Sequence, residues 1–215
     1  MVSMAKTLLA LFLICFTSFT QAQDVTEEFV NQAAYDTVQQ ATDQLIEQIT
    51  SKREVYLEDT EQFFADVDGL LSEVIDFKRI ARRVMAKHYK KAEPDQQAEF
   101  VDVFKRSLLK VYAKALLEYN NEKIEILPPR TSTKVRPNRQ RVDIEFFSND
   151  GQMFPISYSM YLNKQGEWKM ENVVVNGVNI GLTYRNQFAR LMKEHGNDVD
   201  LVISGWTSDL DENAE

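Results

Sequence analysis

The chain has 215 residues, of which 44% are hydrophobic and 27% are charged, and its formal net charge is −8. This length can bury a sizeable core in one domain, and the acidic balance argues against nucleic acid as a partner. With only seven glycines and five prolines, the chain is expected to consist mostly of regular structure joined by short loops.

The N-terminus has the layout of a secretory signal peptide. A positively charged start precedes an apolar run at residues 8–16, which is too short to span a bilayer. Thr20 and Ala22 then place small residues at the −3 and −1 positions of a cleavage site. The sequence therefore predicts a signal peptide over residues 1–22 and an exported mature chain that starts near Gln23.

The only cysteine, Cys15, lies inside that apolar run. Ile14 before it is bulky where a lipoprotein signal has a small residue, so we expect no lipid anchor. The mature chain then contains no cysteine, which excludes a disulfide, a thiolate nucleophile and a cysteine metal site.

Helical periodicity dominates the first half of the mature chain. Apolar residues recur at steps of three and four over residues 26–51 and again over 58–75. Asp76 is placed to cap a third helix, and Pro94 suits the first turn of a fourth helix that runs to about Tyr119. Four amphipathic helices are therefore expected before residue 120.

Alternation of apolar and polar residues replaces this period afterwards and indicates strands. The predicted strands lie at 124–126, 142–146, 156–162 and from 168 to the turn at 176–177. Two closing helices are expected near 180–194 and 197–211. This order predicts an α+β fold of one domain, residues 23–215, with helices packed on one face of a curved four-stranded antiparallel sheet.

Motifs for catalysis or metal binding are missing from the sequence. His88 and His195 are far apart and show no metal-ligand spacing, so we expect both to be solvated or capping residues. No nucleophile elbow, P-loop or dinucleotide fingerprint occurs. Tyr112 and Tyr158 lie on apolar faces, but no acid shares those faces. The sequence therefore predicts no enzyme activity, no metal and no cofactor.

Basic residues gather in two windows that contain no acid, residues 78–91 and 130–141. In the first window a cationic face is predicted opposite the apolar stripe of the third helix. Its members are Arg79, Arg82, Arg83 and Lys87. The charge pattern fits an ordinary solvated surface as well as a docking surface for anionic lipid heads or an acidic partner.

Two segments resemble the MlaC family of periplasmic phospholipid-binding proteins, a family also known for toluene tolerance. The first is DFKRIARRVMAKHYKKAEPDQQAEFVDVFKRSLLKVYAKALLEY at 76–119, and the second is WKMENVVVNGVNIGLTYRNQF at 168–188. Glu93, Asn172 and Asn179 depart from the residues common in the family. Asn179 can still cap the helix that follows, whereas Glu93 is a poorer cap.

The resemblance implies an architecture like that of nuclear transport factor 2, with acyl tails held between the helices and the sheet. It implies a periplasmic carrier that shuttles phospholipid as cargo and helps to maintain outer-membrane lipid asymmetry. The implied partners are the MCE-domain subunit of an inner-membrane ABC transporter and an outer-membrane lipoprotein–porin complex. A monomer without nucleic acid or cofactor is expected.

The tail pocket implied by the resemblance is expected on the apolar phase of each element, although three consecutive valines at 173–175 leave the register of the last strand open. The predicted lining consists of Phe77, Ile80, Val84, Phe104, Leu108, Tyr112, Val142, Ile144, Phe146, Ile156, Tyr158, Met160 and Val174. Two alternatives remain open: a periplasmic protein-binding or chaperone-like module with a solid core and no lipid cargo, and a small-molecule enzyme on the same fold.

Overall fold

The computed structural model describes residues 24–129 and 136–211. The predicted signal peptide and part of the second basic window lie outside these residues. The helices are α1 (Asp24–Ser51), α2 (Arg53–Glu58), α3 (Thr60–Val74), α4 (Phe77–Met85), the 3-10 helix η1 (Ala86–His88), α5 (Pro94–Leu117), α6 (Ile180–Glu194) and α7 (Val199–Asp211). The strands are β1 (Lys123–Ile126), β2 (Arg139–Phe147), β3 (Met153–Leu162), β4 (Trp168–Val175) and β5 (Val178–Asn179).

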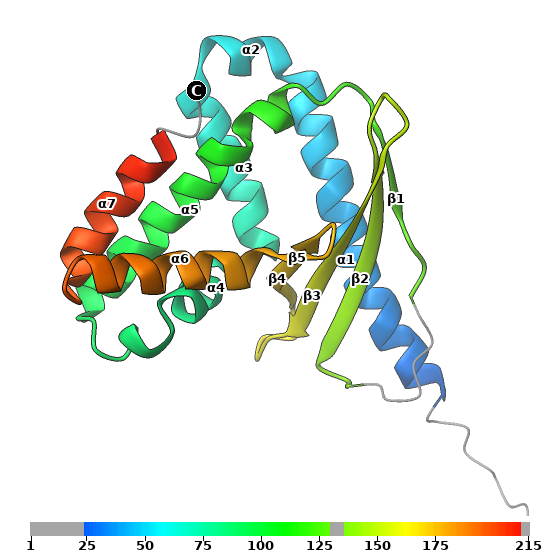
Figure 1. The fold of residues 1–215 in the computed structure, drawn as a ribbon. Helices are drawn as coiled ribbons and strands as arrows, with labels where there is room; N and C mark the ends of the chain where they lie inside the picture. The colour runs from blue at the N-terminus through cyan, green and yellow to red at the C-terminus, as the bar shows by residue number, and fades with distance from the viewer. Residues whose placement is uncertain (1–23, 130–135, 212–215) are drawn as a thin grey trace, which may run out of the picture.

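The strands form one antiparallel sheet in the order β1-β2-β3-β4-β5, so each strand pairs with its neighbour in sequence (Figure 1). The predicted α+β class is confirmed, but the sheet has a fifth strand that the sequence prediction lacks. Asn176 and Gly177 have φ values of 49° and 81°. Positive φ at both central residues is typical of a tight hairpin turn. The chain therefore turns back at this point into β5 instead of leaving the sheet.

Side-chain caps set where two helices begin. The Asp76 carboxylate accepts a hydrogen bond from the Arg79 backbone N–H at 2.8 Å, and the Asn179 side chain accepts one from Leu182 N–H at 3.0 Å. Both caps satisfy a backbone donor that has no partner inside the helix. The predicted starts of α4 and α6 are therefore confirmed.

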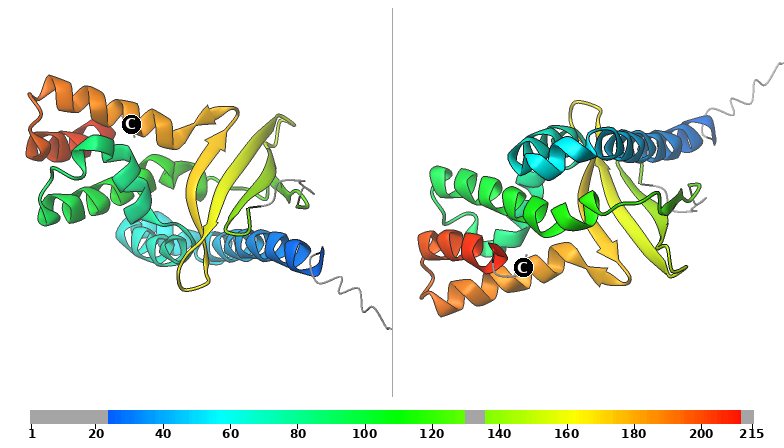
Figure 2. Two further views of the ribbon diagram at one scale, coloured as in Figure 1. Left: turned by 90° about the horizontal axis from the view of Figure 1, so that it is seen from below. Right: turned by 90° about the horizontal axis from the view of Figure 1, so that it is seen from above.

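Helix α1 crosses one face of the sheet, as the two views in Figure 2 show. Ala34 and Val38 of α1 are buried against Val142, Ile144 and Met160 of β2 and β3. These strand residues alternate with polar neighbours, so one face of the sheet is apolar. The contact fixes the long helix across β2, β3 and β4 on that face.

Helices α4 to α7 form a second layer that extends away from the sheet beyond β4 (Figures 1 and 2). Their core is aromatic: the ring centres of Phe100, Phe104 and Phe188 lie 5.3, 5.9 and 6.2 Å from that of Trp206. Edge-on and tilted ring pairs at these distances are favourable beyond their burial.

The environment of His88 differs from the prediction that both histidines are solvated or capping residues. His88 is 7% exposed, and its ring lies 6.0 Å from that of Phe188. The basic neighbours in the sequence suggested a solvated helix, but η1 turns this side chain inward.

Within the described ranges, no helix is long and apolar enough to cross a membrane.

Candidate functional site

An apolar cavity of about 280 Å³ lies between the helices and the β3–β4 part of the sheet. Every α-helix from α3 to α6, together with α1, contributes to one wall, and the sheet contributes the other. The lining residues are Leu45, Leu71, Ile75, Phe77, Ile80, Phe104, Leu108, Leu109, Tyr112, Leu116, Tyr158, Met170, Asn172, Val173, Val175, Ile180, Gly181 and Tyr184. Its volume is near the lower end of small-molecule pockets, about 300–1,000 Å³.

Of the three consecutive valines of β4, Val173 and Val175 line the cavity, and the predicted Val174 does not. Val173 pairs with Tyr158, a cavity residue, whereas Val174 pairs with Ser157 on the opposite face. The pairing shifts between residues 159 and 160 of β3, so that Glu171 is left without a partner residue. Such a β-bulge re-aims the side chains around it.

The polar groups inside the cavity are uncharged. Burial raises the pKa of Tyr158, and burial followed by the neighbouring Tyr112 raises the pKa of Tyr184. Both phenols therefore stay protonated at neutral pH. Tyr112 and Asn172 are the other polar side chains, and no carboxylate, amine or guanidinium is found among the described residues that line the cavity. The site suits an uncharged, apolar ligand.

The structure brings together only part of the predicted tail pocket. Six residues line the cavity: Phe77, Ile80, Phe104, Leu108, Tyr112 and Tyr158. Besides Val174, six predicted residues lie elsewhere. Four of them lie under α1, where Val142, Ile144 and Met160 are buried and Ile156 packs beside them. Phe146 contacts Phe154, and Val84 is buried among the helices.

The reason for this division is that α1 covers a large part of the apolar sheet face. Residues that share the correct strand phase therefore fall either under α1 or beside the cavity. The cavity residues missing from the prediction include Leu109 and Leu116 of α5, and Leu45 and Leu71 of the first helices. Helical spacing places Leu45, Leu71 and Leu116 on apolar helix faces, but spacing does not tell a solid core from a cavity wall.

A buried carboxylate beside the cavity binds three arginines. Glu171 is 6% exposed. Its Oε2 accepts a hydrogen bond from Arg79 Nε at 2.6 Å and lies 3.0 Å from an Arg83 nitrogen, while Oε1 pairs with Arg139. Arg83 also donates to the Glu171 carbonyl at 3.2 Å. Buried charges are stable in proteins when they are paired in this way.

Two members of the predicted cationic face of α4 belong to this cluster, and the docking role of that face stays a prediction. Arg79 and Arg83 are directed at Glu171, and the Arg79 guanidinium also lies 4.0 Å from the centre of the Tyr161 ring. Arg82 lies 5.6 Å from the Tyr89 ring centre. Two of the four predicted docking residues therefore hold α4 against β4, and Arg82 and Lys87 are the members outside the cluster. The sequence does not predict the cluster, because the β-bulge that buries Glu171 has no recognisable sequence pattern.

No cluster of three or more histidine, cysteine, aspartate or glutamate side chains that could hold a metal occurs in the part of the chain that the structure describes. Helices and one face of an antiparallel sheet thus enclose an apolar, uncharged cavity. Together these features define an α+β binding protein for an apolar ligand.

The chain belongs to the MlaC family, because the family model described as MlaC protein matches residues 39–208. It is similar to the toluene tolerance protein ttg2D of Pseudomonas putida, with 37% identity over 180 residues that cover 83% of this chain and 82% of that protein. It is also similar to the intermembrane phospholipid transport system binding protein MlaC of Haemophilus influenzae, with 25% identity over 79% and 78% of the two chains. The family resemblance seen in the sequence is confirmed.

The fold is similar to that of the phospholipid-binding protein from Ralstonia solanacearum, which was solved in complex with a phospholipid. The TM-score is 0.75 at 25% identity, and the match covers 85% of this chain and 99% of that one.

Proposed function

We propose that this chain is a phospholipid carrier that holds acyl tails in the cavity between the helices and the sheet. The observation that carries the proposal is the cavity itself, which is mainly apolar and has no charged side chain among its described lining residues. Two similar proteins support it, since one is named for intermembrane phospholipid transport and the other was solved with a phospholipid bound.

The physical need for such a carrier is large. A diacyl lipid has about 30 methylenes, and each costs about 0.8 kcal/mol to expose to water. Free transit through water would therefore cost on the order of 24 kcal/mol. An apolar cavity offsets this cost for the methylenes that it encloses, and the proposed function needs no catalytic step and no cofactor.

In this proposal the mature chain, residues 23–215, is a single domain that acts in the periplasm as a monomer. It moves phospholipid between the MCE subunit of an inner-membrane ABC transporter and an outer-membrane lipoprotein–porin complex, and so maintains outer-membrane lipid asymmetry. Arg82 and Lys87 are cations on the helix layer with solvent-accessible side chains, and they offer an electrostatic contact for an acidic partner or an anionic membrane.

Mass spectrometry of an organic extract of the purified protein tests the cargo. We expect near-stoichiometric phospholipid, together with a mature N-terminus at or near Gln23 in the periplasmic fraction. Protein that is empty of lipid but retains a protein partner would support the chaperone-like alternative instead. A chain that keeps residues 1–22 in the membrane fraction would contradict export.

A further inference from the structure

A basic pocket at the turn between β3 and β4 is separate from the apolar cavity. Its volume is about 370 Å³, and its lining residues come from α4, the start of β2, the end of β3 and the turn that follows β3. No described residue lines both this turn pocket and the apolar cavity. Arg79, Arg139 and Lys164 contribute three cations to its wall, and no acid is found among the described residues that line it. The turn pocket is therefore a candidate site for an anion.

Arg79 and Arg139 reach the turn pocket from different elements and converge there. Arg79 Nε donates to one carboxylate oxygen of Glu171 at 2.6 Å, and Arg139 pairs with the other oxygen. Both guanidinium groups also face the ring of Tyr161, and their central carbons lie 4.0 and 5.6 Å from the ring centre. These contacts hold the two side chains in place, although the side chains remain 33% and 37% exposed. Two pre-oriented guanidinium groups are therefore open to an anion in the same pocket.

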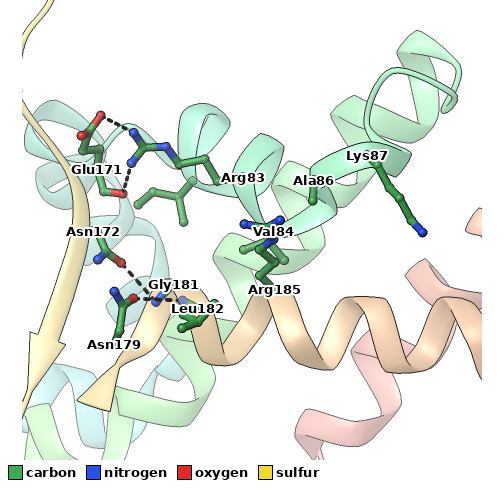
Figure 3. Close-up of a pocket in the computed structure, with 11 residues that line it drawn as sticks. Arg83, Val84, Ala86, Lys87, Glu171, Asn172, Asn179, Gly181, Leu182 and Arg185 are labelled. Carbon is green, nitrogen blue, oxygen red and sulfur yellow. Dashed lines mark hydrogen bonds and ion pairs between the residues drawn. The ribbon is translucent and has the colours of Figure 1, made fainter. Parts of the chain in front are cut away.

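The charge around the turn pocket stays positive after the nearby acids are counted. Arg83 also binds Glu171, as Figure 3 shows, so three arginines share one carboxylate. Asp76, which caps α4, is a second acid beside this cluster. Glu167 in the turn is paired with Lys169. Since each guanidinium carries five N–H donors, the contacts with Glu171 use only some of them.

The rest of the pocket wall and the net charge of the protein favour an acidic peptide segment as the ligand. The amide side chains of Asn138 and Gln165 also line the pocket, and amides can both donate to and accept from peptide groups. An anionic membrane would face the whole protein, whose net charge is −8, and would be repelled. A narrow acidic segment inside the pocket interacts mainly with charges within the screening length of about 8 Å, where cations are in excess.

We propose that the turn pocket binds an acidic segment of a protein partner, with glutamate or aspartate side chains of that segment placed on Arg79, Arg139 and Lys164. The planar guanidinium group matches the geometry of a carboxylate and can bind both of its oxygens. The pocket does not include the apolar cavity, so this proposal does not depend on the lipid cargo. The contacts are partly open to solvent, and their effect should weaken as salt rises.

Binding of a fluorescent peptide to the whole mature protein tests the assignment. The probe is tetraglutamate with blocked termini, and tetraglutamine is the uncharged comparison. We expect the parent protein to bind tetraglutamate at low salt, with an affinity that falls as salt rises, and not to bind tetraglutamine. The substitution Lys164→Glu places a negative charge in the pocket and should weaken tetraglutamate binding about tenfold. Fluorescence anisotropy measures the affinities.

The matched control is Lys193→Glu, which makes the same change of charge at an exposed lysine near the end of α6. Lys193 does not line the pocket, so tetraglutamate affinity should stay within about twofold of the parent value. Both variants change an exposed side chain and should keep the parent's phospholipid content and urea denaturation midpoint. Equal weakening in the two variants, or no tetraglutamate binding by the parent protein, would overturn the pocket assignment and leave the carrier function intact.

An anionic membrane is the other surface that carries negative charge, and sedimentation of the protein with phosphatidylglycerol vesicles distinguishes it. Vesicle binding that is lost in Lys164→Glu and kept in Lys193→Glu would assign the pocket to a membrane surface and overturn the proposal. Tetraglutamate binding that depends on Lys164, without binding to the vesicles, supports it.

Discussion

The two apolar regions of the helix layer are packed in opposite ways. Around Trp206, the rings of Phe100, Phe104 and Phe188 meet at 5 to 6 Å and fill the space between α5, α6 and α7. Beside β4, smaller side chains such as Val173 and Leu108 leave about 280 Å³ open. Since protein interiors are normally close-packed, the solid cluster can fix the helices so that the open space next to it persists.

The largest effect is expected where the packing is solid. Trp206 is fully buried, and its indole N–H donates to Ser107 Oγ at 3.2 Å. The substitution Trp206→Ala should lower the free energy of unfolding by about 3–5 kcal/mol, because it removes a ring from a core that cannot collapse around the gap. Urea denaturation measures this change.

The control for this prediction is Leu201→Ala on the same helix, α7. Leu201 is 50% exposed, so the free energy of unfolding should change by less than about 0.5 kcal/mol. An equal decrease in the free energy of unfolding of both variants would mean that the aromatic cluster does not stabilise the helix layer.

A smaller effect is expected at the boundary between the two regions. Glu171→Gln removes the charge that Arg79, Arg83 and Arg139 share. Those arginines are a third to a half exposed, so water compensates part of the loss, and we expect a decrease of about 1–2 kcal/mol in the free energy of unfolding. Glu167→Gln removes an exposed partner of Lys169 and should leave the free energy of unfolding nearly unchanged. No difference between these two variants would contradict a stabilising role for the buried cluster.

In the open region, filling space should change binding more than stability. Val173→Trp directs a large ring into the cavity, and we expect most of the bound phospholipid to be lost while unfolding stability changes by about 1 kcal/mol or less. Val174→Trp places the same ring on the opposite face of the same strand and should retain the lipid. Organic extraction and mass spectrometry of both variants measure the phospholipid that each one retains. Full lipid content in a folded Val173→Trp protein would place the tails elsewhere.

The smallest expected effect is a pH dependence of the free energy of unfolding, caused by His88 in the solid region. Burial, and then the charges of Lys87 and Lys91, lower the pKa of His88 from 6.5. The unfolded chain therefore binds a proton more readily than the folded one, and stability rises with pH. This contribution is complete above pH 6.5 and is lost as pH falls below 6.5 toward the lowered value. Denaturation midpoints between pH 8 and 5.5 should show it, and His88→Gln should flatten the curve. An unchanged slope would assign the dependence to other groups.

The sequence was sufficient to predict features that depend on local chemistry. The caps at Asp76 and Asn179, the helical span of α6 and the alternation of β2 and β3 all follow from short-range patterns. The cavity is also lined by residues such as Phe77 and Leu108, whose helical periodicity is visible in the sequence. These local patterns explain why the fold class and the family can be recognised from the amino-acid sequence.

Other features depend on contacts that are distant in the sequence. The bulge at Glu171 decides that Val173, and not Val174, reaches the cavity. The position of α1 decides that Met160 is buried under it, whereas Tyr158 also lines the cavity. Neither feature has a local sequence signal, because each depends on which element packs on the sheet and at which position. The pairing of Arg79 and Arg83 with a carboxylate about 90 residues away is of the same kind.

The order of the strands has a consequence for how the chain folds. Each strand of the sheet pairs with the next one along the chain, so the sheet can assemble as successive hairpins with short loops to close. Helix α1, in contrast, packs on β2 and β4, and the Tyr35 hydroxyl reaches the carbonyl of Ile126, 91 residues later. Pairings over such distances are slow to form. Helix α1, which precedes the sheet in the chain, is therefore among the last elements to be fixed in place, and until then the apolar face of the sheet is left uncovered.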